Sequence, residues 1–382
     1  MDTVREMAAV TAQEGRSAGT DAERRTAVLL RDRLREMGRE AELQTVQVRP
    51  RFGLAHTAHA LLAVVGSVVA VESPAVGGVL ILVAALSTFL DVTNIFHLAR
   101  RFTGRRVSQN VESSEDAGKP GTLVLVAHYD APRDAMAFAF ASRLLRDPWL
   151  AMLGAMLLLI GCCVARALGA EGIALTAAQF APTVLLILLV PALADIELSG
   201  TSRGTADNAA GVATVLRLAD ELGGRLEHFD LWVLFTGARE PFALGMSGWL
   251  KKRRKELDRE ATAVLNVDGI GCGPVTFSRR EGPLLPLRSH SQLVRICQEI
   301  AEDDRREGAF SARPRVVRAR SDAAAAIARG LPALTVSREG DSVGPDEMDG
   351  AYAFCRELVE RLDAEVGPQL GEVRKSPAGS AA

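Results

Sequence analysis

Four long apolar runs constrain this 382-residue chain more than any other feature. They are residues 53–71, 74–90, 149–165 and 173–194. A helix that crosses a bilayer needs roughly 20 apolar residues, with about 17 to 25 acceptable, and all four runs reach that range. Short turns join them in pairs, which predicts two transmembrane hairpins. The alternative is core helices of a large soluble protein, but paired runs of this length are hard to bury otherwise.

Basic residues flank the outer ends of both hairpins. They are Arg49, Arg51, Arg100, Arg101, Arg105, Arg106, Arg143 and Arg146. The two connecting turns hold only Arg166. Because cytoplasmic flanks carry the excess of Lys and Arg, both hairpins are predicted to start and finish in the cytoplasm. The sequence therefore predicts a multi-pass protein of the cell membrane with the rest of the chain folded on the cytoplasmic side.

Composition narrows the compartment and the partners. The formal net charge is -2, so no bulk attraction to nucleic acid is expected. The five cysteines form no CxxC pair, and two of them lie inside an apolar run. That usage favours a reducing compartment over a disulfide-stapled secreted protein. The first 50 residues are polar and do not resemble a signal peptide.

Outside the hairpins, strand-like and helix-like segments alternate. Apolar runs of strand length occur at 122–127, 230–235, 263–267 and 333–336, and helical patterns at 208–222, 244–260, 289–304 and 347–363. Continuous apolar strands are typical of a parallel sheet covered on both faces. This alternation predicts an α/β fold with a mostly parallel central sheet and helices on both faces.

The predicted organisation is one discontinuous domain interrupted by the hairpins. The domain is assigned to residues 1–52, 92–148 and 195–366, the hairpins to 53–91 and 149–194, and a disordered tail to 367–382. The tail is rich in Pro, Gly, Ser and Ala, a composition that buries too little apolar surface to fold.

Polar side chains gather just past the ends of the predicted strands. They are His128, Asp130, Arg239, Glu240 and Asp268, and Asp207 opens the helix after a glycine-containing loop. Ligands of open α/β sheets lie at the carboxyl ends of strands, so these side chains are expected to converge. One imidazole and three carboxylates suit Zn²⁺ by ligand type. Asp130 is expected to hydrogen-bond a ligand or to orient the His128 ring.

Each of these residues also has an ordinary explanation. A histidine after a strand is usually a loop residue, Asp207 is a good helix N-cap, and Glu240 reads as a surface charge. Asp268 precedes Gly269 and suits a turn. The shared position past strand ends, and no single residue, is what favours a metal site.

Seven segments in order resemble the co-catalytic zinc aminopeptidase family, whose relatives include bacterial leucyl aminopeptidases, glutamate carboxypeptidases and glutaminyl cyclases. They are Ser-Gln-Asn-Val at 108–111, Val-Ala-His-Tyr-Asp at 126–130, Ala-Asp-Asn-Ala-Ala-Gly-Val at 206–212, Phe-Thr-Gly-Ala-Arg-Glu at 235–240, Asn-Val-Asp-Gly-Ile-Gly at 266–271, Ser-Asp at 321–322 and Gly-Leu-Pro-Ala at 330–333. The resemblance implies the aminopeptidase-like fold and a hydrolase of peptide or amide bonds. It also implies that Asp207 bridges two zinc ions, that His128 and Asp268 complete one site, and that Glu240 belongs to the other.

The chain departs from the family pattern at two positions. The family has a Glu-Glu pair whose first member is the general base, and this chain has Arg239 there. The last family ligand is a histidine, and alignment on Pro345 puts Val343 in its place. Asp341, Asp346 and Glu347 are the candidate substitute ligands.

These departures change the expected chemistry. A guanidinium stays protonated and has no acceptor, so Arg239 cannot take a proton from the attacking water. General bases typically contribute about 10² to 10⁴-fold to the rate. Two readings stay open: a hydrolase with altered or reduced activity, and a catalytically dead pseudopeptidase that acts as a membrane-anchored binding module. A transporter is less favoured, because no internal charged pair is evident in the spans.

The two departures are explained together if one metal has been lost. With a single zinc at His128, Asp207 and Asp268, Arg239 is predicted to pair with Glu240 and replace the second cation, so one ion is favoured over two. The alternative is that Arg239 points to solvent in a decayed site. The second hairpin enters between His128 and Asp207, so we expect a peptide or amide substrate, or ligand, close to the membrane. His56, His59, His97, His228 and His290 fit no motif and are interpreted as structural or interfacial.

Overall fold

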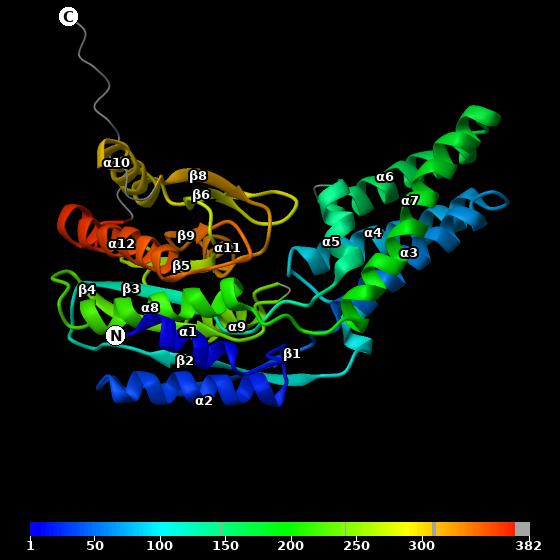
Figure 1. Cartoon of the computed structure of the whole chain (residues 1–382). Helices are drawn as coiled ribbons and strands as arrows, with labels where there is room; N and C mark the ends of the chain where they lie inside the picture. The colour runs from blue at the N-terminus through cyan, green and yellow to red at the C-terminus, as the bar shows by residue number, and fades with distance from the viewer. Residues whose placement is uncertain (146, 241, 308–310, 371–382) are drawn as a thin grey trace, which may run out of the picture. The chain divides into compact units, whose positions relative to one another are not determined.

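A computed structural model describes residues 1–145, 147–240, 242–307 and 311–370. The chain divides into two compact units (Figure 1). The sheet unit comprises Met1–Val48, Val107–Pro132 and Arg203–Ala382, and the helical unit comprises Arg49–Arg106 and Arg133–Ser202. Arg146 and residues 371–382 of the predicted tail lie outside the described residues. The domain boundaries drawn from the sequence stay a prediction.

The sheet unit is built on one sheet, to which the described residues contribute nine strands. The strands are β1 (Glu42–Val48), β2 (Arg106–Ser113), β3 (Gly121–His128), β4 (Phe229–Thr236), β5 (Thr262–Ile270), β6 (Val275–Glu281), β7 (Leu287–Arg288), β8 (Arg313–Val317) and β9 (Ala333–Arg338). Their order is β1-β2-β4-β3-β5-β9-β6-β7, with β8 on β6. The central strands β4, β3, β5 and β9 are parallel, and β2 and β6 join them antiparallel.

The central strands are buried on both faces, which explains their unbroken apolar sequence. Because successive side chains of a strand point to opposite faces, Leu123 and Leu125 enter one hydrophobic core, whereas Val124 and Val126 enter the other. The first core also contains side chains of α1 (Thr3–Thr11), α2 (Asp21–Glu36), α8 (Ala210–Leu222), α10 (Ser291–Glu307) and α12 (Pro345–Arg361). The second contains side chains of α9 (Leu244–Lys252) and α11 (Asp322–Ile327). The predicted α/β architecture is confirmed.

Element bounds differ from the prediction in one informative place. The helix predicted over 244–260 ends at Lys252, and the residues after it form turns. Arg253 is the C-cap residue, and its guanidinium pairs with Glu112 on β2, at 2.9 Å, and with Glu256. The periodic charge of this segment imitated a solvated helix face, so the sequence pattern did not reveal the break.

The described residues of the helical unit form four helices long and apolar enough to cross a membrane, by length and composition. They are α3 (Phe52–Val69), α4 (Pro74–Val92), α6 (Pro148–Ala167) and α7 (Ile173–Leu198). A shorter helix, α5 (Met136–Leu145), and the turn η1 (Ala99–Phe102) complete the unit. Small residues allow α3 and α4 to pack closely: a Cβ atom built at Gly66 would lie 2.9 Å from the Gly77 carbonyl oxygen.

A buried charged cluster, which we call the Asp91 cluster, lies inside the helical unit. Asp91 of α4 is 1% exposed and accepts from Arg100 Nε at 2.8 Å. His56 Nε2 lies 3.2 Å and His97 Nδ1 2.5 Å from its carboxylate oxygens. His59 continues the cluster, with Nε2 2.8 Å from Ser87 Oγ. The expectation that the spans hold no internal charged pair is therefore wrong, because Asp91, in the last turn of α4, contacts His56 of α3.

Candidate metal site

The carboxyl ends of three neighbouring parallel strands bring the predicted site residues together. His128 is the last residue of β3, Asp268 lies near the end of β5, and Arg239 and Glu240 follow β4. Asp207 lies in the turn η2 (Thr205–Ala209), directly before α8. Since β4, β3 and β5 are adjacent and parallel, their ends share one edge of the sheet, which is why residues distant in sequence meet here.

Three ligand atoms converge on one position. His128 Nε2 lies 2.9 Å from Asp207 Oδ1 and 3.2 Å from Asp268 Oδ1. The donor atoms of all three residues lie within 4.8 Å of one another, and no other group of this kind occurs among the described residues. The Asp207 side chain is 41% exposed, whereas His128 is fully buried. One imidazole and two carboxylates, reached by water at one side, match a zinc site with three protein ligands and an open position.

Backbone and side-chain oxygens of Asp130 hold this arrangement in place. His128 Nδ1 lies 3.0 Å from the Asp130 carbonyl oxygen, which only accepts, so Nδ1 carries the proton and Nε2 is left to face a cation. The Asp130 carboxylate accepts from the backbone N–H groups of Arg239 and Glu240 at 3.1 and 2.9 Å. Asp130 therefore ties the end of β3 to the loop after β4 and does not itself join the ligand group.

Arg239 lies within the site. Its Nη2 donates to Asp268 Oδ2 at 2.8 Å, and its Nη1 pairs with the Glu240 carboxylate. The Arg239 side chain is only 12% exposed, so the alternative in which it points to solvent does not describe this structure. The guanidinium bridges two carboxylates that would otherwise repel each other.

The electrostatics of the site follow from this crowding. Burial and the Arg239 cation lower the pKa of His128, but the carboxylates of Asp268, Asp130 and Asp207 outweigh them and hold it well above its usual range. Burial alone raises the pKa of Asp268, yet Arg239 and His128 bring it well below its ordinary value. Burial dominates at Glu240 and raises its pKa. The position between His128, Asp207 and Asp268 thus stabilises positive charge.

The remaining predicted ligands do not join the group of three. Asp341 and Asp346 are exposed, and Glu347 Oε2 accepts from the Gly344 N–H at 2.9 Å, where it caps α12. Val343, at the position of the family histidine, packs against the first hydrophobic core. Glu240 is held by Arg239 and is also absent from the group.

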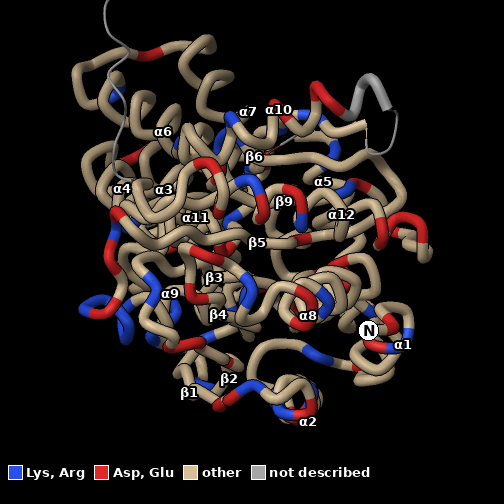
Figure 2. The backbone as a smooth tube through the Cα atoms, turned by 90° about the vertical axis from the view of Figure 1, so that its left-hand side faces the viewer, with Lys and Arg blue, Asp and Glu red and all other residues tan. Residues whose placement is uncertain are grey.

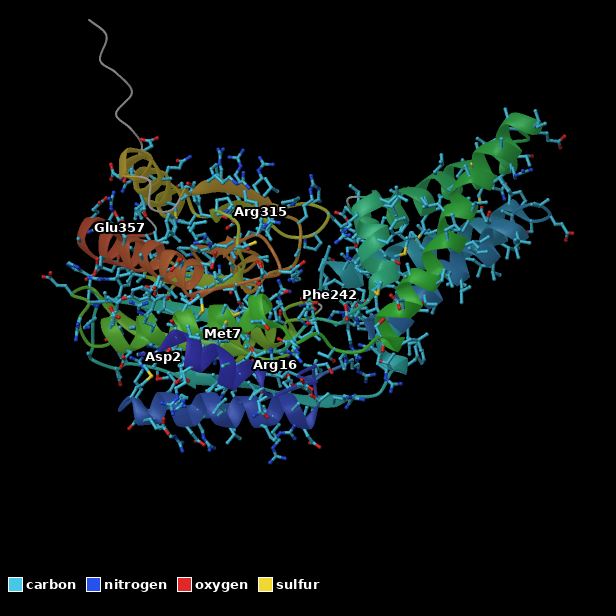
Figure 3. All side chains as sticks on the ribbon, viewed as in Figure 1. Asp2, Met7, Arg16, Phe242, Arg315 and Glu357 are labelled. Atoms are coloured by element: carbon cyan, nitrogen blue, oxygen red, sulfur yellow. The ribbon has the colours of Figure 1, made fainter. Side chains whose placement is uncertain are left out.

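Supporting residues without a sequence signature complete the site. Arg16, labelled in Figure 3, is fully buried and donates to the carbonyl oxygens of Tyr129 at 2.9 Å and Arg203 at 2.9 Å. It thereby joins the loops that carry His128 and Asp207. Asn208 does the same for Asp207 and Asp268, donating to Val267 O at 2.8 Å and accepting from Gly269 N at 3.1 Å. A lone arginine in a polar loop gave no signal for this role.

The mostly parallel sheet and the group of three ligand atoms at its carboxyl edge have counterparts in known proteins. Residues 190–352 match the model of peptidase family M28, a stretch that includes Asp207, Glu240 and Asp268. The resemblance drawn from the sequence is therefore confirmed.

Three solved structures show the same fold. A leucine aminopeptidase precursor from Bacteroides thetaiotaomicron is 10% identical, with 94% of this chain and 95% of that chain covered and a TM-score of 0.51. Glutaminyl cyclase from Tannerella forsythia is 12% identical, with 94% and 97% covered and a TM-score of 0.51. LapB from Legionella pneumophila is 11% identical, with 95% and 71% covered and a TM-score of 0.51. No curated protein sequence matches the chain significantly. The family match covers residues 190–352, and the three structures show the fold.

Proposed function

We propose that this protein is a membrane-integral, aminopeptidase-type zinc hydrolase of peptide or amide bonds with altered or reduced activity. The observation that carries the proposal is the convergence of His128, Asp207 and Asp268 at the carboxyl edge of the sheet, within 4.8 Å of one another. One structural neighbour is a leucine aminopeptidase precursor, which agrees with the proposed reaction class. The substrate is proposed to be a peptide or an amide.

A single zinc ion fits these residues better than two. His128, Asp207 and Asp268 supply three ligands, and zinc bound there would supply Lewis-acid polarisation of a carbonyl group. The second position would have Asp207 and Glu240, but the Arg239 guanidinium already pairs with Glu240. Two cations so close would repel each other strongly at low dielectric. We therefore assign to Arg239 the place of a second metal.

The surrounding residues position the ligands and balance their charge. Asp130 fixes the His128 ring through its carbonyl oxygen, and Arg16 and Asn208 fix the loops. Arg239 neutralises Glu240 and Asp268 and has no acceptor with which to take a proton from water. Loss of a general base costs about 10² to 10⁴-fold in rate, so turnover is expected to be slow compared with an aminopeptidase that has the base.

The membrane assignment rests on the four apolar helices. The arginines at the outer ends of the hairpins support a cytoplasmic sheet unit by the positive-inside rule. The order of the chain, with the second hairpin between His128 and Asp207, motivates a membrane-proximal substrate.

Metal content and hydrolysis test the proposal together. The full chain, purified in detergent after expression with zinc, is expected to carry about one zinc per chain by elemental analysis, and to release aminocoumarin slowly from aminoacyl-coumarin substrates. The His128→Ala variant is expected to lose both. Two zinc ions at full occupancy, or no zinc in a folded wild-type protein, contradicts the proposed site.

The second candidate is a catalytically dead pseudopeptidase that binds a peptide or partner in the same crevice. The observation that favours it is the pairing of Arg239 with both Asp268 and Glu240, which fills the position of the base. Zinc-loaded protein without hydrolysis above the His128→Ala background, tested on a panel of aminoacyl and peptide substrates, decides for this candidate.

A further inference from the structure

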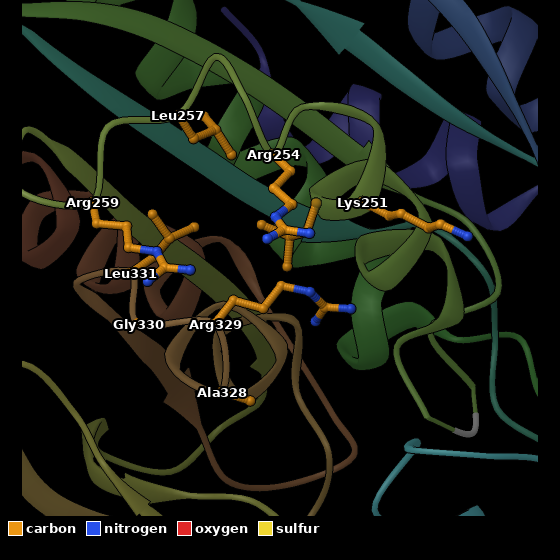
Figure 4. Close-up of a pocket in the computed structure, with 9 residues that line it drawn as sticks. Lys251, Arg254, Leu257, Arg259, Ala328, Arg329, Gly330 and Leu331 are labelled. Atoms are coloured by element: carbon orange, nitrogen blue, oxygen red, sulfur yellow. The ribbon is translucent and has the colours of Figure 1, made fainter.

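A basic pocket lies on the sheet unit, lined by residues from the end of α9, from the segment after it and from the loop after α11. We call it the basic pocket and define it by Lys251, Arg254, Arg259 and Arg329, over apolar residues that include Leu250 and Leu331 (Figure 4). Its volume is about 590 Å³, and none of the described residues that line it is Asp or Glu. Figure 2 shows the basic run as blue segments beside α9. These residues are not part of the metal site.

The arginines that line the pocket differ from Arg253 in their ion pairing. Arg253, in the same basic run, pairs with Glu112 at 2.9 Å and with Glu256. Among the described residues, Lys251, Arg254 and Arg259 have no carboxylate within ion-pair distance. Arg253, outside the pocket, is thus neutralised by carboxylates, whereas the arginines that line the pocket are not. Crowded like charges are unfavourable unless an anion joins them.

Helix capping explains only part of the cluster. Arg329 donates to the Ala325 carbonyl oxygen at 3.0 Å at the end of α11, and Lys251 lies in the last turn of α9, where cations are favourable. Arg254 and Arg259 lie beyond the end of α9 and have no such role. Gly330, at a φ of +80°, has no side chain, and Arg259 runs over it: an added Cβ would lie 3.8 Å from Arg259 Cδ. The Arg259 side chain is therefore directed along the pocket wall.

We propose that the basic pocket binds a phosphate group that carries at least two negative charges. Guanidinium groups present forked donors that match phosphate oxygens, and three of them converge on one concave surface. Such a concavity focuses the positive field even though the net charge of the chain is -2. The volume is in the range of small-molecule sites, about 300 to 1,000 Å³. The phosphate is that of a soluble small molecule or of a lipid headgroup.

Titration with pyrophosphate tests the pocket. The full chain in a non-ionic detergent at low ionic strength is expected to bind pyrophosphate saturably in a calorimetric titration. The Arg254→Gln/Arg259→Gln variant is expected to bind at least about tenfold more weakly, since it loses two groups that donate charge-assisted hydrogen bonds. The matched control, Lys252→Gln/Lys255→Gln, removes two charges from the same run outside the pocket and is expected to bind within about twofold of wild type. Absent saturation, or an equal loss in the control, overturns the proposal.

Two further measurements complete the design. The Arg254→Lys/Arg259→Lys variant keeps the charge and loses the fork, and is expected to bind with intermediate affinity; it also serves if the glutamine variant does not fold. Nanodiscs of phosphatidylcholine alone, or with phosphatidic acid, a phosphate monoester that can carry two negative charges, identify the source of the phosphate. If phosphatidic acid weakens pyrophosphate binding in wild type and phosphatidylcholine does not, the pocket binds a headgroup. If neither lipid competes, the pocket binds a soluble phosphate.

Discussion

Two buried clusters, one in each unit, contain carboxylates, arginine and histidine, but they differ in the proportion of acidic to basic groups. In the metal site, the carboxylates of Asp207, Asp268 and Glu240 share one permanent cation, Arg239. In the Asp91 cluster, the proportion is reversed: one carboxylate contacts Arg100 and two histidine rings. The first cluster is short of positive charge and the second is not.

This difference separates a binding site from a structural one. A buried carboxylate without a full set of partners is costly, and the cost is offset when a cation arrives. The metal site also has an opening to water at Asp207, 41% exposed, whereas Asp91 is 1% exposed. The comparison predicts that changes in the Asp91 cluster alter folding, and that changes in the metal site alter metal binding and rate with little effect on folding.

The largest effect is expected from Asp91→Asn. The substitution leaves the fully buried Arg100 beside a neutral side chain, and breaking a buried ion pair typically costs about 3 to 5 kcal/mol. Urea unfolding of the full chain in detergent, followed by circular dichroism, measures the loss. The control is Glu72→Gln, which changes an exposed charge in the turn between α3 and α4 and is expected to be neutral. A loss below about 1 kcal/mol for Asp91→Asn removes the structural role.

The next effect concerns the two departures from the family pattern. Arg239→Glu combined with Val343→His restores both missing groups, so zinc is expected to rise from about one to about two ions per chain and the hydrolytic rate by about 10²-fold or more. Arg239→Glu alone is expected to raise the zinc content and the rate less than the double variant does, because without the histidine no second zinc is held beside the added carboxylate. If the double variant folds and gains neither zinc nor rate, the crevice differs from the family in more than these two groups.

A smaller effect is expected from Asp207→Asn, which sharpens the comparison with Asp91. Asp207 contacts His128 and is 41% exposed, so the metal-free protein is expected to unfold within about 0.5 kcal/mol of wild type. Zinc affinity, measured by chelator competition, is expected to fall by at least about 10- to 100-fold. Asp341→Asn is the matched control for the proposed substitute ligands. An equal loss of zinc in that variant makes Asp341 a ligand and breaks the three-residue site.

The sequence predicted those parts of this comparison that depend on local pattern. The apolar runs of β3, β4, β5 and β9 identified the central sheet, and the rule that ligands lie at strand ends brought together His128, Asp207 and Asp268. The Arg239–Glu240 pair was predicted from charge balance, once the resemblance to the family had identified the two departures at Arg239 and Val343. These inferences needed the order of strands, the chemistry of the side chains and the family pattern.

The missed features depend on contacts between distant segments. Arg16 joins the loops of Tyr129 and Arg203, and no local pattern marks such a bridge. The Asp91 cluster was missed because His56, His59 and His97 are separated by apolar residues and look ordinary until α3 and α4 pack together. The end of α9 was missed because the charge pattern continues past Lys252, and the contact of Arg253 with Glu112, 141 residues away, leaves no local signal.

The smallest effect comes from a third kind of buried acid, one with no cation in contact. Asp322 is fully buried and accepts from Thr236 Oγ1 at 2.5 Å. Burial raises the pKa of Asp322 from 3.8 to about 6. The folded state therefore holds a proton that the unfolded state releases between these values, and stability is expected to fall as pH rises from about 4 to about 6 and then level off. The Asp322→Asn side chain is neutral, so the loss of stability across this pH window is expected to become smaller by about 1 to 2 kcal/mol. A full conversion at about 1.4 kcal/mol per pKa unit would give more, but the protein relaxes around the charge.

Unfolding of the metal-free protein at several pH values measures the dependence of stability on pH, with Asp341→Asn as an exposed control. An unchanged slope in Asp322→Asn shows that this buried acid, like Asp91, has its charge compensated in the folded protein.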